Sequence, residues 1–377
     1  MVSSPRRSRG PLGDLPAAFG WSAILLPFIP VAVALSLAGA GSTLVFVASA
    51  LGVIPTASLM GRATEELAAR SGPGIGGLLN VTFGNAPELI IALFALGAGL
   101  QEVVKASIVG SIIGNVLLVL GASMFVGGWR RDHQRFNETA ANVQATMLLL
   151  AVAAIAMPAV YVLVTGPPGL PSPTAQLVEY DSSVGTLSLV ASGILLFAYV
   201  AGLFFSLKTH RDLFNPEHSG AVAESWSVRK SVLALAVAGA LVALMSEILV
   251  GSIEETAQKI GLSEFFIGAI VVAIVGNAAE HWVAVLAAKK DQMDLSVNIS
   301  IGSSAQVALF VAPVLVLASY VLGPGPMPLV LNGFELAAVV LAALIAGQVT
   351  QDGRSTWFEG LQLLSVYAIV AVAFFFA

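Results

Sequence analysis

Two glutamates lie inside long apolar segments of this 377-residue chain, and each ends the same short motif. Glu88 ends the stretch GNAPE at 84–88, and Glu280 ends the stretch GNAAE at 276–280. If these segments cross a bilayer, each carboxylate costs at least about 2.5 kcal/mol at the membrane centre, so it is expected to face a cavity or a partner. A carboxylate in such a cavity can bind a cation or a proton.

Each motif is followed at the same distance by a serine, Ser111 or Ser303, 23 residues after its glutamate. The second serine belongs to a GSSAQ stretch that ends at Gln306. The expected ligands are all oxygen atoms: the carboxylates of Glu88 and Glu280, the side chains of Ser111, Ser303 and Gln306, and backbone carbonyls near Gly84 and Gly276.

An all-oxygen site with two carboxylates suits a hard cation. Ca²⁺ takes about six to eight oxygen ligands in a flexible arrangement, whereas Mg²⁺ requires a tighter octahedron and keeps its waters. The chain has no cysteine, which excludes thiolate metal sites and disulfides. The same carboxylates can instead bind protons, because burial and mutual repulsion favour their neutral forms. Cation and proton would then compete for the same oxygens, which is the physical basis of antiport.

The two motifs are expected to interrupt their helices to different degrees. Glycine and asparagine disfavour a continuous helix, and Pro87 suits the first turn of a new half-helix that starts just before Glu88. The carbonyls of Gly84 and Asn85 are then freed to face a cavity. The second motif has Ala279 in place of the proline, so we expect a milder break there.

The composition indicates a membrane protein. Hydrophobic residues make up 57% of the chain and charged residues 10%, against about 25% charged in a soluble domain. The first apolar run matches the thickness of a bilayer, so we interpret it as a retained span rather than a signal peptide. Eleven apolar segments can be delimited, at 21–40, 43–61, 74–99, 103–127, 139–165, 183–207, 231–251, 262–288, 293–320, 327–347 and 356–377.

The basic residues orient these spans. With a cytoplasmic N-terminus, 15 of the 17 lysines and arginines fall on the cytoplasmic side, and only Lys105 and Lys259 fall outside. We expect a multi-pass protein of a prokaryotic cell membrane, with a vacuolar membrane as the alternative.

The paired motifs indicate an internal repeat. Glu65-Glu66 precede the first motif, and Glu254-Glu255 precede the second. Each unit holds five spans, an odd number, so the second unit is inverted, which is a recurring transporter architecture. The predicted fold is an all-α polytopic membrane protein of about 11 transmembrane helices, with one extra N-terminal helix and two inverted five-helix repeats. The predicted parts are residues 1–42 (tail and extra helix), 43–208 (first repeat), 209–230 (cytoplasmic linker) and 231–377 (second repeat).

Other acidic and histidine residues have two interpretations each. The pairs Glu65-Glu66 and Glu254-Glu255 could form cation-collecting vestibules or be solvated helix ends paired with Arg62 or Lys259. His281 could tune proton exchange or gating, or be a hydrogen-bonded packing residue. Glu247 and Glu335 are candidates for a proton path, although we expect Glu335 to lie at the membrane interface.

Several functional classes are disfavoured. No basic stripe suits nucleic acid. The remaining histidines, His133, His210 and His218, fall in loops, so no intramembrane protease site is evident. An inverted repeat favours alternating access over a passive channel. No resident cofactor is expected, and a homo-oligomer remains possible.

At these motifs the chain resembles the calcium/proton exchanger family of the calcium/cation antiporter superfamily, over nearly its whole length. The likeness is carried by ATEELA at 63–68, GNAPELI at 84–90, SLKTHRDLF at 206–214, GNAAEH at 276–281 and NISIGSSAQVALFVAP at 298–313.

The resemblance implies a secondary antiporter that removes Ca²⁺ from the cytosol in exchange for protons. Glu88 and Glu280 would be the exchanging carboxylates, and the residues lining the site would be Asn85, Asn277, Ser111, Ser303 and Gln306. The linker departs from the family's acidic helix, because its acids are Asp212, Glu217 and Glu224 alone. The alternatives are a Na⁺-coupled Ca²⁺ exchanger and a proton antiporter for Mn²⁺, Na⁺ or K⁺ with the same fold.

Overall fold

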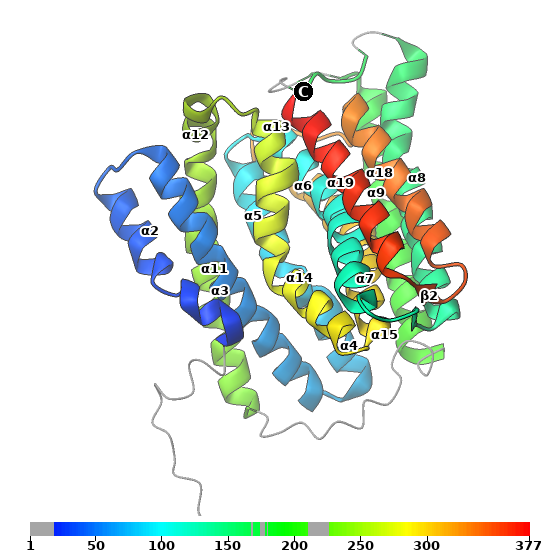
Figure 1. Cartoon of the computed structure of the whole chain (residues 1–377). Helices are drawn as coiled ribbons and strands as arrows, with labels where there is room; N and C mark the ends of the chain where they lie inside the picture. Colours follow the sequence, from blue (N-terminus) through cyan, green and yellow to red (C-terminus); the bar gives the residue numbers. More distant parts are fainter. Residues whose placement is uncertain (1–18, 167–168, 174–177, 179, 210–225) are drawn as a thin grey trace, which may run out of the picture.

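The computed structural model describes residues 19–166, 169–173, 178, 180–209 and 226–377 as a bundle of helices (Figure 1). The acids predicted in the linker lie outside these residues. Two short helices precede the repeats: the 3-10 helix η1 (Gly20–Leu25) and the α-helix α2 (Phe28–Leu37).

The first repeat runs from α3 to η3. Its helices are α3 (Ser42–Arg70), α4 (Gly72–Gly84), α5 (Ala86–Gly97), α6 (Gln101–Ile113), the π-helical turn η2 (Gly114–Val119), α7 (Leu120–Gly128), α8 (Glu138–Thr165), α9 (Ser182–Phe204) and the π-helical turn η3 (Phe205–Thr209).

The second repeat runs from α11 to α19. Its helices are α11 (Val228–Gly251), α12 (Ile253–Ile260), α13 (Glu264–Phe266), η4 (Ile267–Val272), α14 (Ala273–Lys289), α15 (Met293–Val297), η5 (Asn298–Gly302), α16 (Ser303–Gln306), η6 (Val307–Val311), α17 (Ala312–Ala318), α18 (Gly333–Val349) and α19 (Trp357–Phe375); η4, η5 and η6 are π-helical.

Each of the eleven predicted apolar segments overlaps one helix or a run of consecutive helical elements. In the described part of the chain, nine helices are long and apolar enough to cross a membrane, and a tenth candidate is the bent pair Ile75–Gly84 and Ala86–Gly97. The remaining segment, 327–347, overlaps the shorter apolar helix α18. The predicted fold class is confirmed.

The two repeats run in opposite directions. In Figure 1, α3 descends while its counterpart α11 rises beside it, and the α4–α5 pair rises while α14 descends. A short antiparallel ribbon joins the repeats at the lower end, where β1 (Gln134–Arg135) pairs with β2 (Arg354–Ser355). Equivalent motifs therefore approach the centre of the bundle from opposite sides.

The repeats meet at glycines where α6 crosses η4. A Cβ atom built on Gly110 would lie 2.0 Å from the carbonyl oxygen of Ala269. A Cβ atom on Gly268 would lie 2.9 Å from the carbonyl oxygen of Val103. Small residues at a membrane helix interface allow this close backbone approach.

The predicted span 327–347 begins later than expected. Helix α18 starts at Gly333, after a capping box in which Asn332 and Glu335 exchange side-chain to backbone hydrogen bonds. The preceding extended backbone is satisfied by side chains, since Ser188 accepts from the N–H of Leu329 and Lys105 donates to the carbonyl of Val330. Irregular backbone at this depth is tolerated because the protein surrounds it.

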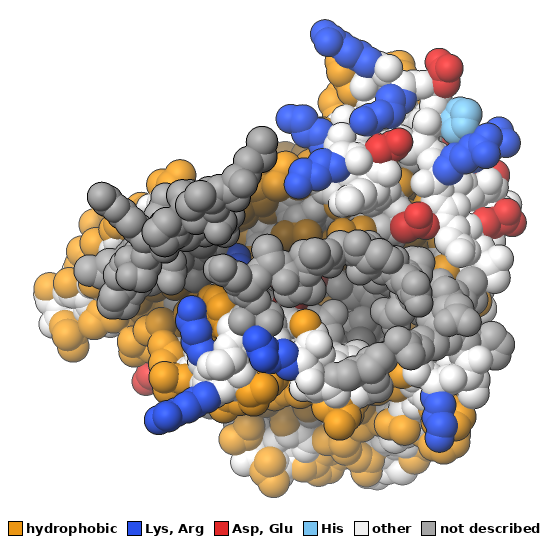
Figure 2. Space-filling model, turned by 90° about the horizontal axis from the view of Figure 1, so that it is seen from below, with side chains coloured by type: hydrophobic (Ala, Val, Ile, Leu, Met, Phe, Trp, Pro, Cys, Tyr) orange, Lys and Arg blue, Asp and Glu red, His pale blue; other side chains and the backbone are white. Residues whose placement is uncertain are grey.

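The described lysines and arginines gather at the lower end of the bundle (Figure 2). They lie near the ends of α3, α7, α9 and α14, the start of α11, and in the β1–β2 ribbon: Arg62, Arg70, Arg130, Arg131, Arg135, Lys208, Arg229, Lys230, Lys289, Lys290 and Arg354. The two predicted exceptions, Lys105 and Lys259, lie on α6 and α12, toward the other end. This lower end is called the basic face below.

Candidate functional site

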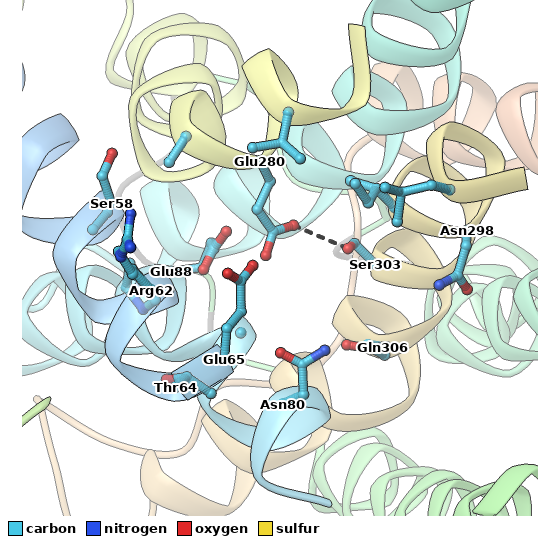
Figure 3. Close-up of a pocket in the computed structure, with 18 of the residues that line it drawn as sticks. Ser58, Arg62, Thr64, Glu65, Asn80, Glu88, Glu280, Asn298, Ser303 and Gln306 are labelled. Atoms are coloured by element: carbon cyan, nitrogen blue, oxygen red, sulfur yellow. Dashed lines mark hydrogen bonds between the residues drawn. The ribbon is translucent and has the colours of Figure 1, made fainter. Parts of the chain in front are cut away.

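A cavity of about 550 Å³ lies between α3, α4, α5, α14 and α16 and holds the two predicted carboxylates. Figure 3 shows the carboxylate ends of Glu65, Glu88 and Glu280 turned toward one another in it. Its lining extends to Leu207 in η3 and to Leu295 in α15. These positions lie near the basic face, so the cavity extends toward that face.

Glu88 lies in the first turn of α5, where the helix restarts after its break at Asn85. The axes of the two half-helices differ by 42°, as the glycine, asparagine and proline of the motif predicted. A helix N-terminus favours a negative charge. The Oε2 atom of Glu88 is buried and has no hydrogen-bond partner among the described residues. That oxygen is available to a ligand.

Glu280 lies in the middle of α14, which continues through the second motif. The milder break predicted at this motif is wrong, because α14 is continuous there; the π-helical turn η4, a feature often found at functional sites, ends four residues before Gly276. The hydroxyl of Ser303 donates a hydrogen bond of 3.0 Å to Glu280 Oε2. Ser303 begins α16, so the interaction links two segments of the second repeat.

The glycine of each motif lies against the glutamate of the other repeat. A Cβ atom on Gly84 would be 3.7 Å from Oε1 of Glu280, and a Cβ atom on Gly276 would be 3.5 Å from Cγ of Glu88. Each glycine therefore provides the space in which the opposite carboxylate lies. This reciprocal packing brings the two motifs together from segments 192 residues apart.

The two asparagines hold the repeats together behind the cavity. Asn85 donates a 2.6 Å hydrogen bond to Oε1 of Gln306 in the other repeat. Asn277 donates to Ser111 at 3.2 Å and to the carbonyl of Ala273 at 2.9 Å. Gln306 lines the cavity, whereas Asn85, Asn277 and Ser111 are buried and do not belong to its lining.

The two predicted vestibules are placed differently. Glu65 lines the cavity, and Glu66 beside it accepts the backbone N–H of Trp226 at 2.9 Å. Glu254 and Glu255 lie on α12 at the opposite end and are exposed, and neither lines this cavity. Glu255 pairs with Lys259.

Three other candidates lie outside the cavity lining. His281 is half-buried, and its Nε2 lies 3.0 Å from Oδ1 of Asn115, which is the arrangement of a hydrogen-bonded packing residue. Glu247 is exposed on α11, four residues before that helix ends.

The side chain of Glu335 is fully buried in the protein, and its expected position at the membrane interface stays a prediction. Glu335 lies within electrostatic range of Lys105, which pairs with Glu102 at 2.7 Å. Lys105, which we expect on the outer side of the membrane, is also buried and only 2% exposed. Glu102, Lys105 and Glu335 thus form a buried cluster of charges.

Sequence reasoning gave no role in the cavity to seven polar residues of its lining: Ser58, Arg62, Thr64, Asn80, Gln144, Ser206 and Asn298. Asn80 precedes Gly84 of the first motif by four residues on α4, a spacing that could have placed both on the same side of that helix. Asn298 is the first residue of the NISIGSSAQ stretch, and Gln144 donates a hydrogen bond to its Oδ1.

The cavity does not present a complete metal shell. Among the described residues, no three histidine or acidic side chains come together closely enough to hold a metal ion. What the site offers is two carboxylates that face each other, a serine hydroxyl and amide oxygens, all hard ligands. Such a set of ligands suits a transported cation, which must first bind and then be released.

A helical membrane bundle built of two inverted repeats, with a site between them, is typical of secondary transporters. Of the solved structures, that of YfkE superposes with a TM-score of 0.79 at 41% identity, covering 94% of this chain and 100% of that one. The family model described as "Sodium/calcium exchanger protein" matches residues 41–208 and 230–376.

Curated relatives give a narrower assignment. The chain is 44% identical to a Ca²⁺/H⁺ antiporter of Synechocystis over 94% of its own length and 96% of the relative's. It is 44% identical to the Ca²⁺/H⁺ antiporter ChaA of Bacillus subtilis over 92% and 96%. The chain therefore belongs to the sodium/calcium exchanger family, and within it to the calcium/proton exchangers, which are transporters rather than enzymes.

Proposed function

We propose that this protein exports cytosolic Ca²⁺ in exchange for protons, with Glu88 and Glu280 as the shared binding groups. The observation that carries the proposal is the reciprocal packing of the two motifs, which puts one glutamate from each inverted repeat into a single cavity. The names of the curated relatives support the choice of ions.

Competition for the same oxygens couples the two ions. A divalent cation between the carboxylates neutralises both of them, and its charge disfavours protons on the same groups. Without the cation, the buried carboxylates are best accommodated in protonated form, because an isolated charge in a low-dielectric site is costly. Each exposure of the site therefore carries either the cation or protons, with about two protons per Ca²⁺ if only these two carboxylates exchange.

The further ligands are proposed from their positions. Ser303 and Gln306 line the cavity and are expected to bind the cation directly, as are the carbonyls of Gly84 and Gly276. Asn85, Asn277 and Ser111 lie behind this lining and are expected to hold the two motifs in register. No resident cofactor is needed for this chemistry.

Alternating access would follow from the inverted repeat. The cavity extends toward the basic face, and the described residues of the opposite end, Glu254 and Glu255 among them, do not line it. If the basic face is cytoplasmic, as the positive-inside rule predicts, the structure is an inward-facing state in which Glu65 lies on the entry route. The mirror arrangement of the two repeats supplies the outward-facing state. The same rule places the N-terminus in the cytoplasm, and the bacterial relatives favour a bacterial cell membrane.

The test is ⁴⁵Ca²⁺ uptake into proteoliposomes with an imposed acid-inside gradient, with and without Na⁺. Wild type is expected to take up Ca²⁺ only with the proton gradient and regardless of Na⁺. Glu88→Gln and Glu280→Gln are expected to abolish uptake. Glu247→Gln is the matched control, because Glu247 is a carboxylate of a spanning helix outside the cavity lining.

Two results would overturn the proposal. Uptake driven by a Na⁺ gradient would make the protein a Na⁺-coupled exchanger of the same fold. Uptake that survives either glutamine substitution would remove the shared-carboxylate mechanism. Faster transport of Mn²⁺, Na⁺ or K⁺ than of Ca²⁺ under the same gradient would change the assigned cargo.

A further inference from the structure

Arg62 is a positive charge within a cavity proposed to bind cations. It lies on α3, one turn before Glu65, and it is the one cationic side chain among the described residues of the cavity lining. Figure 3 shows its guanidinium on the α3 side of the space that Glu88 and Glu280 occupy. A binding site for cations gains nothing in affinity from such a residue, so its presence calls for a separate role.

The surroundings of Arg62 hold its guanidinium near the cavity. Its Nη2 lies 3.7 Å from Oε1 of Glu66, and the guanidinium carbon lies 5.7 Å from the centre of the Trp226 ring. Glu66 also accepts the backbone N–H of Trp226, so the three residues form one cluster. Arg62 interacts electrostatically with Glu65 as well. The side chain remains 39% exposed, which keeps the charge in contact with the water of the cavity.

The negative charges around the cavity indicate a role for the positive charge of Arg62. Three carboxylates, those of Glu65, Glu88 and Glu280, face the same space. With all three ionised, the cavity would attract a divalent cation strongly, and stronger attraction slows release. A fixed positive charge weakens the attraction, and it does so twice as strongly for a divalent cation as for a monovalent one.

We propose that Arg62 is a resident counter-cation that lowers the affinity of the cavity for divalent cations and thereby keeps release fast. The proposal rests on the proposed function, namely that Glu88 and Glu280 bind the transported cation. Arg62 belongs to α3, whereas the two glutamates belong to α5 and α14. Any movement of α3 relative to those helices changes the distance between this charge and the bound cation, which gives the affinity a dependence on the conformation of the transporter.

The experiment compares ⁴⁵Ca²⁺ transport by wild type, Arg62→Gln and Arg62→Lys in proteoliposomes driven by an acid-inside gradient. Arg62→Gln is expected to lower KM for Ca²⁺ by about three- to tenfold, the size of a unit charge removed from a partly solvated site. Its maximal rate is expected to fall, because tighter binding slows release. Arg62→Lys keeps the charge and is expected to have a KM near that of wild type.

Controls separate this role from a structural one. Arg70→Gln removes a charge from the end of the same helix outside the cavity lining and is expected to leave KM unchanged. The difference in KM between wild type and Arg62→Gln is expected to shrink as ionic strength rises, since salt screens a charge that is in contact with water. If Arg62→Gln does not accumulate in the membrane, Arg62→Met, which keeps the length of the side chain, replaces it in the same comparison.

An unchanged or raised KM in the neutral variant would overturn the inference, as would a KM for Arg62→Lys equal to that of Arg62→Gln. Failure of the proposed function is a different result, because wild type itself would then not exchange Ca²⁺ for protons.

Discussion

Replacing Gly110 by alanine tests the contact at which the two repeats cross. The added Cβ would lie 2.0 Å from the carbonyl oxygen of Ala269 and 2.6 Å from its carbon. Non-bonded heavy atoms pack best at about 3.5 Å, so α6 and η4 must move apart by more than about 1 Å. Overpacking of a core costs about 1–3 kcal/mol and occasionally more, and we expect at least about 3 kcal/mol here because the obstacle is backbone rather than a flexible side chain.

The assay is thermal unfolding of the purified protein in detergent, followed by tryptophan fluorescence. A loss of about 3 kcal/mol corresponds to a fall in Tm of about 4 °C for a chain of this size. Gly114→Ala is the matched control, one turn further along the same span, where a Cβ meets nothing within 4 Å. Alanine favours a helix over glycine by about 1 kcal/mol, so the control is expected to keep or raise Tm.

Two results would refute this reasoning. Equal Tm values for Gly110→Ala and wild type would mean that the repeats do not approach as closely as the structure shows. An equal fall in Gly110→Ala and Gly114→Ala would mean that the glycines matter through backbone flexibility rather than through the space they leave.

Three further predictions concern the site and the buried charges. Ser303→Ala removes the hydroxyl that donates to Glu280, and KM for Ca²⁺ uptake is expected to rise about fivefold, the equivalent of about 1 kcal/mol; an unchanged KM would exclude Ser303 as a ligand. Lys105→Met leaves Glu102 and Glu335 buried without their cation, so thermal unfolding is expected to show a loss of about 3–5 kcal/mol, and an unchanged Tm would argue against a buried ion cluster. Raising the pH on the cavity side at a constant driving force is expected to lower KM for Ca²⁺, because protons leave the carboxylates that the cation needs; a KM independent of pH would contradict the competition.

The architecture was predictable from the sequence because the bilayer imposes strong rules. Apolar runs long enough to span it, the one-sided distribution of basic residues and the duplicated motif define the order of the helices and the inversion of the repeats. The break at Asn85 was predictable for a local reason, the proline that follows it at the start of α5.

The arrangement behind the two glutamates was harder to predict, because it depends on which helix faces which. The motif places Asn277 beside Glu280, but only the packing shows that Asn277 bonds to Ser111 rather than facing the cavity. The burial of Glu335 and Lys105 was not predictable, because position along a span does not show whether a residue faces lipid, water or the protein interior. The sequence indicates Arg62 only as an ion-pair partner of the neighbouring acids, since helical spacing alone does not show that Arg62 faces the cavity.

The central claim is that Glu88 and Glu280 bind Ca²⁺ and protons in competition. The most direct measurement is the number of protons released when Ca²⁺ binds to the purified protein, obtained by calorimetry in buffers of different ionisation enthalpy. The account predicts release of protons by wild type, about two per Ca²⁺ if both carboxylates are protonated beforehand, and a smaller number or no binding in Glu88→Gln and Glu280→Gln. Ca²⁺ binding without proton release, or release unchanged in both variants, would contradict it.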